Sequence, residues 1–173
     1  VTRDRLEVAI VTFDDEVNTV QGPELLTDFT MPTLQTAGCT AMIDGISEAI
    51  DIVAYRKQYY KSHGIPYYRP WIVMMTDGEP DRDQDVAGMA QLIAEANNRK
   101  EFVFMAVGVG NDVNESVLQQ LSTSSFPPMK MQAVKFCEFF TWLSNSMSTI
   151  SNSDGGNVKL DDPGSWLDNM ITH

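Results

Sequence analysis

The residue whose position best suits chemistry is Asp77, which comes directly after an uninterrupted apolar run at residues 71–75. The run contains no charge and does not alternate with polar residues, which is typical of a strand buried on both faces of a parallel sheet. An acid that follows such a strand lies at the carboxyl edge of the sheet, where open α/β folds bind ligands. Asp77 is therefore a candidate ligand-binding residue, with an ordinary Asp-Gly turn as the alternative.

A second candidate, Thr40, precedes a long helical pattern. Apolar residues recur at three- and four-residue spacing across residues 41–60, which predicts an amphipathic helix with Thr40 at its N-cap. A hydroxyl at a helix start and a carboxylate at a strand end suit a hard divalent cation such as Mg²⁺, which prefers oxygen ligands. Thr40 and Asp77 alone are too few to hold the ion, so further ligands are expected.

Alternating strands and helices are expected to position these two residues. Apolar runs predict strands at residues 6–13, 16–20, 71–75, 101–109 and 129–133. Helical spacing predicts helices at residues 41–60, 86–100, 114–122 and 134–150. This order indicates an α/β fold with a doubly wound, Rossmann-type, mostly parallel sheet and one antiparallel edge from the early hairpin. We expect residues 71–75 and 102–107 to be adjacent parallel strands, joined by the helix at residues 86–100.

The chain is long enough for one domain, because 173 residues with 43% hydrophobic content can bury a core. We assign residues 1–150 to this domain and residues 151–173 to a linker and C-terminal tail. The boundary follows from the Gly-, Ser- and Asn-rich composition of the residues after 150. Asp162 and Pro163 predict a last turn of helix in the tail.

The net charge of −12 argues against two classes of partner. Nucleic acids and anionic membranes both bind basic surfaces, and this chain has 24 acidic against 12 basic residues. No apolar stretch reaches the roughly 20 residues that span a membrane, and no signal peptide is visible. The two cysteines, Cys39 and Cys137, match no metal or redox spacing. Reduced thiols in a cytoplasmic protein are the expected state.

Two motifs together resemble the von Willebrand factor A domain. One is Gly-Cys-Thr-Ala at residues 38–41, ahead of a helix, and the other is the apolar run that ends in Thr-Asp-Gly-Glu-Pro-Asp at residues 72–81. They are similar to two of the three loops that form this family's metal-ion-dependent adhesion site. The resemblance covers residues 6–151 and extends to the bacterial tellurium-resistance (TerY-like) branch. Further segments resemble that branch at residues 11–15, 64–80, 104–110 and 135–151.

The resemblance implies a non-enzymatic, metal-ion-dependent protein-binding domain in a cytoplasmic bacterial stress or tellurite-resistance system. Thr40 and Asp77 would hold Mg²⁺ or Mn²⁺ directly or through water, and no residue is assigned a catalytic role. The partner would be a protein that offers an acidic side chain to the metal, with kinase- and phosphatase-like proteins as candidates. Glu79 and Asp81 would flank the entrance and face this partner.

One element of the family pattern is absent. The family's first loop carries Asp-x-Ser-x-Ser after a central strand, and that motif occurs nowhere in this sequence. We therefore expect the strand and its helix to lie before Val1 or to come from another chain, with weak or no metal binding by this chain alone. We also expect the strands at residues 6–13 and 71–75 to be separated by a gap or joined by a strand from outside the chain.

An enzymatic alternative also uses Asp77. A Mg²⁺-dependent phosphotransfer or phosphatase-type enzyme would favour a basic residue near the phosphate, and the nearest to Asp77 in sequence is Arg82. The pair Asp14-Asp15, which follows a strand, is similar to the acid pair of a receiver domain. A receiver domain places a helix after the pair, whereas a hairpin and a proline-containing loop are expected here.

Several remaining patterns have structural explanations. The alternating acids at residues 81–85 lack the Gly and Glu that a calcium loop needs at its sixth and twelfth positions. His63 and His173 lie near no plausible nucleophile. Residues 108–110, Gly-Val-Gly, lack the third glycine of a dinucleotide loop. The aromatic face of the helix at residues 134–150 is most simply core, given its helical spacing.

Overall fold

The structure is a computed structural model that describes residues 4–33, 40–110, 113–132, 135–153 and 160, and the backbone of residues 169–170. Its strands are β1 (Glu7–Phe13), β2 (Val17–Leu25), β3 (Trp71–Thr76), β4 (Val103–Val109), β5 (Met129–Met131) and β6 (Asn169–Met170). Its helices are α1 (Met42–Ser62), α2 (Val86–Asn98), α3 (Glu115–Leu121) and α4 (Phe136–Ser151). None of the helices in these residues has the length and hydropathy that crossing a membrane requires.

Strands β3, β4 and β5 form a parallel sheet, to which β6 adds an antiparallel edge. β3 and β4 pair from Trp71 opposite Val103 to Thr76 opposite Gly108, and α2 lies between them in the chain. The prediction of two adjacent parallel strands in this part of the sequence is therefore confirmed.

The C-terminal strand differs from what the sequence predicts. A last turn of helix is expected after Asp162 and Pro163, but both residues lie outside the described part of the chain. The backbone of residues 169–170 forms β6, which pairs with Met129 and Lys130 of β5. A strand of two residues is too short to show a periodic pattern in the sequence. β6 is therefore recognised only by its pairing with β5.

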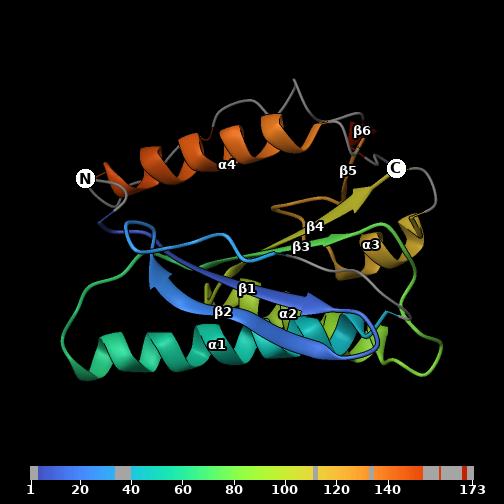
Figure 1. Ribbon diagram of the computed structural model, residues 1–173. Coiled ribbons are helices and arrows are strands. Elements are labelled where there is room, and N and C mark those ends of the chain that lie inside the picture. The colour runs from blue at the N-terminus through green and yellow to red at the C-terminus, as the bar shows by residue number, and fades with distance from the viewer. Residues whose placement is uncertain are drawn as a thin grey trace.

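Helices cover both faces of the larger sheet, with α1 and α2 on one side and α4 on the other (Figure 1). The side chains of β4 alternate between the two layers. Phe104 and Ala106 belong to the core cluster with α1, α2 and α3, whereas Met105 and Val107 belong to the cluster with α4. A strand that packs on both faces needs apolar residues at every position, which explains the continuous apolar run.

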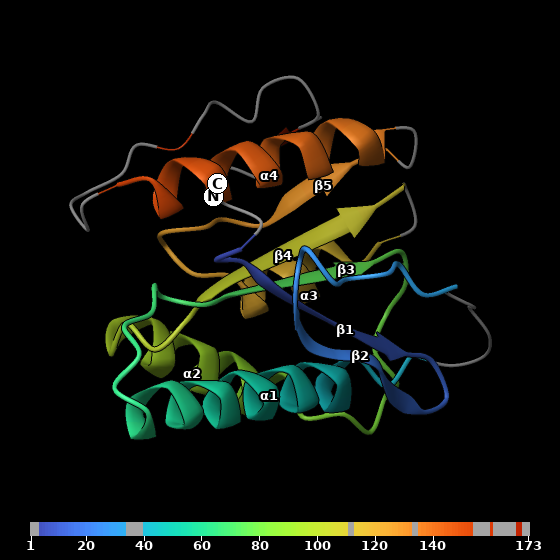
Figure 2. The same cartoon turned by 60° about the vertical axis from the view of Figure 1, so that its left-hand side comes forward.

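β1 and β2 form a second, antiparallel sheet that is separate from the first (Figure 2). The hairpin is present as predicted, but it is not the edge of one continuous sheet. Within the described residues, no backbone hydrogen bond joins β1 to β3. The predicted gap between these two strands is therefore confirmed, and the single doubly wound sheet that the sequence predicts is divided into two.

Helix α1 holds the hairpin in place. The amide of Ala41 donates a hydrogen bond to the carbonyl of Asp14 in the hairpin turn, at 2.8 Å. Further along the helix, Gly45 allows a close approach, because a Cβ atom there would lie 2.8 Å from Cβ of Phe13. The position of β1 over α1 therefore depends on a residue without a side chain at Gly45.

At the start of β1, Glu7 forms a bidentate ion pair with Arg56 of α1. Arg56 Nε and Nη2 donate to the two carboxylate oxygens at 2.6 and 2.5 Å, and the guanidinium lies over the rings of Tyr59 and Tyr60. The hydrogen bonds from Arg56 lower the pKa of the Glu7 carboxyl below its ordinary value of 4.5, against the opposing effect of burial. The Glu7 side chain is only 17% exposed, so solvent screens this pair less than a surface pair.

Replacing Glu7 by Gln is expected to lower the free energy of unfolding by about 1–2 kcal/mol at neutral pH, because charge-assisted hydrogen bonds are lost. A carboxyl whose pKa is lowered by folding contributes stability above its unfolded pKa, and this contribution is lost as the pH falls through the folded pKa. Urea unfolding should therefore show the two proteins converging as the pH falls below 4.5.

The matched control is Glu95→Gln. Glu95 pairs with Arg99 within α2 and its cap, and the two side chains are 52% and 61% exposed. This substitution should change the free energy of unfolding by less than about 0.5 kcal/mol. A loss for Glu7→Gln that is independent of pH would contradict the assigned role of the ion pair.

The aromatic side chains of α4 divide between core and solvent. Phe139 and Trp142 are buried against the sheet, whereas Phe136 and Phe140 are exposed. The prediction that the whole aromatic face is core is therefore wrong for Phe136 and Phe140. These two residues stack on one another one turn apart, on a stripe rotated away from the one that contacts β4 and β5.

Candidate functional site

Asp77 lies where the sequence predicts it, directly after β3 at the carboxyl edge of the parallel sheet. The amide of Gly78 donates a hydrogen bond to the hydroxyl of the buried Thr76 at 3.2 Å. This bond holds the turn that leads the chain out of the sheet. The Asp-Gly sequence therefore forms a turn and also leaves the Asp77 side chain exposed to solvent.

Thr40 precedes α1, but it is not the N-cap that the sequence predicts. The helix begins at Met42 with Ala41 at the cap position, and no side chain caps it there. Instead, the Gln84 side chain accepts a hydrogen bond from the Ile43 amide at 2.8 Å and donates one to the Thr40 carbonyl at 3.0 Å. The N-cap prediction is wrong because a side chain from the loop before α2 satisfies the unpaired amide of the first turn.

The structure brings the Thr40 and Asp77 segments together. The Asp81 amide donates to the Thr40 carbonyl at 3.2 Å, so the loop after β3 runs alongside the start of α1. A Cβ atom at Gly78 would lie 3.6 Å from Thr40 Oγ1, an ordinary van der Waals distance. The Thr40 hydroxyl therefore lies beside the residue that follows Asp77.

Glu79 and Asp81, which are predicted to face a partner, have different surroundings in the same loop. Glu79 is exposed, and its carboxylate accepts a hydrogen bond from the Asn114 side chain at 3.1 Å. Asn114 is also the N-cap of α3 and accepts from the Val117 amide. Asp81 is half-buried and contacts Thr40 through its backbone amide. The loop is thus tied to the starts of both α1 and α3.

Two other acidic patterns have structural roles. Asp85 caps α2, because its Oδ1 accepts from the Gly88 amide at 2.8 Å, so it is engaged in the helix start rather than in a calcium loop. Asp14 Oδ1 accepts from the Glu16 amide at 3.1 Å in the hairpin turn. Strand β2 follows this turn, whereas a receiver domain would have a helix there. The receiver-domain alternative is therefore wrong.

The oxygen donors at this edge fit part of a Mg²⁺ coordination shell. A hydroxyl and a carboxylate are ligands of the kind that Mg²⁺ prefers, and the ion usually keeps several waters. Among the described residues, no group of three or more His, Cys, Asp or Glu side chains is placed to hold a metal. Thr40 and Asp77 would thus supply few protein ligands and leave most coordination positions to water.

The charge around this edge is negative. The loop after β3 carries the acids Asp77, Glu79, Asp81, Asp83 and Asp85 and the base Arg82. Clustered acids of this kind attract cations and repel anionic ligands. The electrostatics of the edge therefore favour a divalent cation over a free phosphate group.

Gln84 and Asn114 help to position the edge, and sequence patterns do not identify either role. Gln84 lies between acids in a loop and matches no motif. Asn114 precedes a helical pattern, which is an N-cap signal, but its bond to Glu79 depends on the folded arrangement. Cys137 is free and exposed, whereas Cys39 lies outside the described residues.

Comparisons with known proteins place this arrangement in a family. A search of the curated proteins found no significant match. A family model described as the von Willebrand factor type A domain matches residues 1–141, which is most of the chain. The matched residues include Thr40, Asp77 and the segments that bring them together. The chain therefore belongs to the von Willebrand factor type A domain family.

Proposed function

We propose that this chain is a metal-ion-dependent protein-binding domain whose ion lies between Thr40 and Asp77, at the carboxyl edge of β3. Domains of this family generally mediate metal-dependent protein interactions, and the family match spans both residues. The observation that carries the proposal is the position of the Thr40 hydroxyl, 3.6 Å from where a Cβ atom at Gly78 would lie. The Thr40 hydroxyl therefore lies beside the residue that follows Asp77, which supports a site shared by the two residues.

Thr40 Oγ1 and the Asp77 carboxylate would hold Mg²⁺ or Mn²⁺, directly or through water. The bound ion would supply a positive site for an acidic side chain of the partner. Glu79 and Asp81 would flank the entrance. Because the surrounding loop is acidic, a partner whose acidic residue has basic neighbours would be favoured over a uniformly acidic one.

We further propose a non-catalytic role in the cytoplasm of a bacterium, in a stress or tellurite-resistance system with kinase- or phosphatase-like partners. The support is the resemblance of residues 11–15, 64–80, 104–110 and 135–151 to the TerY-like branch. The net charge of −12 supports binding to a protein rather than to a nucleic acid.

Removing the Asp77 carboxylate is expected to weaken Mn²⁺ binding by at least about tenfold, since one of the few charged ligands is lost. Electron paramagnetic resonance of free Mn²⁺ measures weak binding directly, and competition with Mg²⁺ tests whether both ions share the site. The wild type should retain Mn²⁺ weakly, and Asp77→Ala should release it.

Asp83→Ala is the matched control, because Asp83 is an exposed acid in the same loop but outside the proposed ligand set. This variant should bind Mn²⁺ about as well as the wild type. Equal Mn²⁺ binding by the wild type and Asp77→Ala would overturn the proposal. Loss of binding in Asp83→Ala would move the ion to the acids at residues 81–85.

A further inference from the structure

The two ends of the parallel sheet carry opposite charge. At the carboxyl edge, the loop after β3 carries the exposed acids Asp77, Glu79, Asp83 and Asp85. The opposite end is the side of the molecule where β3 and β4 begin and where α1 and α2 end (Figures 1 and 2). The bases at that end are Lys57, Lys61, Arg69, Arg99 and Lys100.

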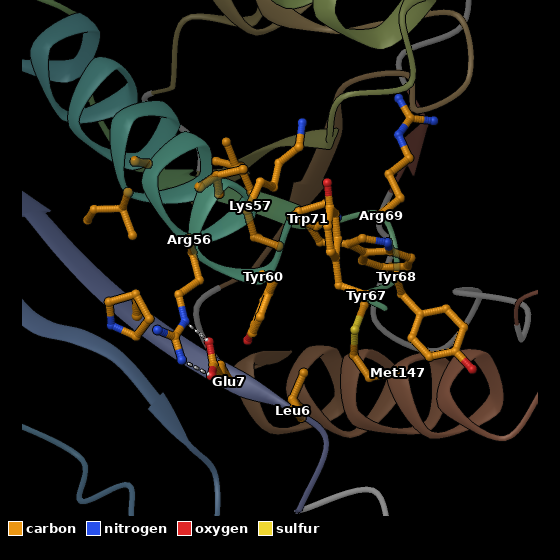
Figure 3. Close-up of a pocket in the computed structure, with 18 of the residues that line it drawn as sticks. Leu6, Glu7, Arg56, Lys57, Tyr60, Tyr67, Tyr68, Arg69, Trp71 and Met147 are labelled. Atoms are coloured by element: carbon orange, nitrogen blue, oxygen red, sulfur yellow. Dashed lines mark hydrogen bonds and ion pairs between the residues drawn. The ribbon is translucent and has the colours of Figure 1, made fainter. Parts of the chain in front are cut away.

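Lys57 and Arg69 converge on the turn between α2 and β4. Lys57 Nζ donates a hydrogen bond to the carbonyl of Glu101 at 3.1 Å, and Arg69 Nη2 donates to the carbonyl of Phe102. Figure 3 shows the two side chains pointing in the same direction. Both bases contact neutral carbonyl oxygens, and neither forms an ion pair within the described part of the chain. Their positive charges are therefore not neutralised.

Lys61 and Lys100 add two exposed charges to this end. Lys61 lies in the last turn of α1, and Lys100 follows α2. Neither residue has an ion-pair partner among residues that the structure describes, whereas Arg99 pairs with two acids. Lys57, Lys61, Arg69 and Lys100 thus form a surface with four positive charges, which we call the basic end.

The backbone at Lys100 is unusual for a lysine. Its φ of 57° lies in the left-handed region, which glycine adopts without strain and lysine rarely adopts. The local conformation therefore does not explain a lysine at this position. A backbone outlier of this kind often marks a functional site, and here it presents a positive charge to solvent.

Apolar side chains accompany these charges. Tyr59, Ile65 and Tyr68 are 38%, 43% and 43% exposed. Tyr59 lies near the end of α1, and the other two lie in the loop that leads to β3. Aromatic side chains are enriched in protein interfaces. The basic end therefore has exposed apolar groups as well as charge.

The acidic loop of a second copy matches the chemistry of this surface. Asp77, Glu79 and Asp83 form no ion pair within the described ranges, so both ends of each copy carry unneutralised charge. Two acidic ends or two basic ends would repel one another, whereas opposite ends attract. Because charges more than about 10 Å apart are largely screened at about 0.1 M salt, local pairs outweigh the net charge of −12.

We propose that the chain associates with itself head to tail, with the acidic loop at residues 77–85 of one copy docked on the basic end of the next. Each copy offers one surface of each kind, so the contact is heterologous and can extend into open chains. The contact uses the same loop as the proposed metal site, but it depends on the charge of that loop and not on a bound ion.

Sedimentation velocity of the intact chain tests the association. A chelator in the buffer removes divalent ions, so the result is independent of the proposed metal site. Species larger than the monomer should appear as the chain concentration rises at about 0.1 M salt. They should disappear at about 1 M salt, where the screening length falls to about 3 Å.

Charge reversal at either end identifies the surfaces. Lys61→Glu with Lys100→Glu reverses the basic end, and Glu79→Lys with Asp83→Lys reverses the acidic loop. Each double variant alone should associate at least about tenfold more weakly than the wild type. An equimolar mixture should associate again, because every contact then joins opposite charges. Both variants remain negative, since each pair of reversals changes the net charge of −12 by four units, so overall attraction cannot produce this rescue.

Two single variants separate charge from folding. Lys135→Glu is the matched control, because Lys135 pairs with Glu138 at the start of α4, outside the basic end. It should associate like the wild type. Lys100→Gly removes a charge and relieves the left-handed backbone, so it should raise the urea midpoint of unfolding while it weakens association.

Three results would overturn the proposal. The first is a wild-type chain that stays monomeric at every concentration at about 0.1 M salt. The second is association that neither salt nor the double variants weaken, which would indicate an apolar contact elsewhere on the chain. The third is a mixture of the two double variants that associates no more than either variant alone.

Discussion

Replacing Phe139 by Ala is expected to lower the free energy of unfolding by about 3–5 kcal/mol. Phe139 is fully buried in α4 and packs in the core cluster with residues of β4 and β5. Its ring also contacts Trp142, with ring centroids 6.1 Å apart. Truncation removes the apolar contact area and leaves a cavity, and a loss of this size is a large part of the stability of a single domain. Urea unfolding at equilibrium measures the change.

The adjacent residue gives a control for this prediction. Phe140 is 51% exposed, so Phe140→Ala should lower the free energy of unfolding by less than about 1 kcal/mol. The two variants lose the same side chain from the same helix, and only burial distinguishes them. Similar losses for both would show that α4 packs on the sheet with a different face.

Replacing Gly108 by Val is expected to destabilise the chain by about 1–3 kcal/mol, because it overpacks the core. A Cβ atom at Gly108 would lie 2.7 Å from a methyl group of Leu118 and 2.9 Å from methyl groups of Val113. Valine favours strands, but both contacts are too short for a packed interior to accept. This glycine therefore allows α3 to pack closely on β4. The packing explains why a glycine stands here, and no dinucleotide-binding role is needed to explain it.

Gly22→Val is the corresponding control. Gly22 also lies in a strand, β2, but nothing lies within 4 Å of a Cβ atom there. The substitution should therefore be neutral or slightly stabilising, because a β-branched residue replaces a flexible one. Thermal or urea unfolding of both variants separates the packing cost from the change in strand propensity. An unchanged stability for Gly108→Val would contradict the close packing of α3 on β4.

The parallel sheet could be predicted from the sequence because its inner strands are continuous apolar runs. Residues 71–75 and 102–107 are each recognisable as inner strands from their uninterrupted apolar sequence, without reference to any other segment. The separation of β1 from β3 has no local signal, since pairing between strands depends on residues far apart in sequence. Only the missing family motif indicated the gap in advance.

The candidate site was predictable to a similar extent. The position of Asp77 follows from one general rule, that ligands bind at the carboxyl ends of parallel strands. The contacts around Thr40 do not follow from such a rule, because Gln84 lies 44 residues further along the chain. Likewise, helical spacing places Phe139 and Phe140 on the same helix but does not decide which of two adjacent aromatic residues faces the core.

The location of the ion tests the central claim most directly. Mn²⁺ broadens the nuclear magnetic resonance signals of amides close to it, so a titration of the isotopically labelled chain maps the binding site. The account predicts that the signals of Thr40, Asp77 and Gly78 broaden first, and that excess Mg²⁺ restores them. Broadening that begins at residues 81–85, or that spreads evenly over the acidic surface, would contradict a metal site formed by Thr40 and Asp77.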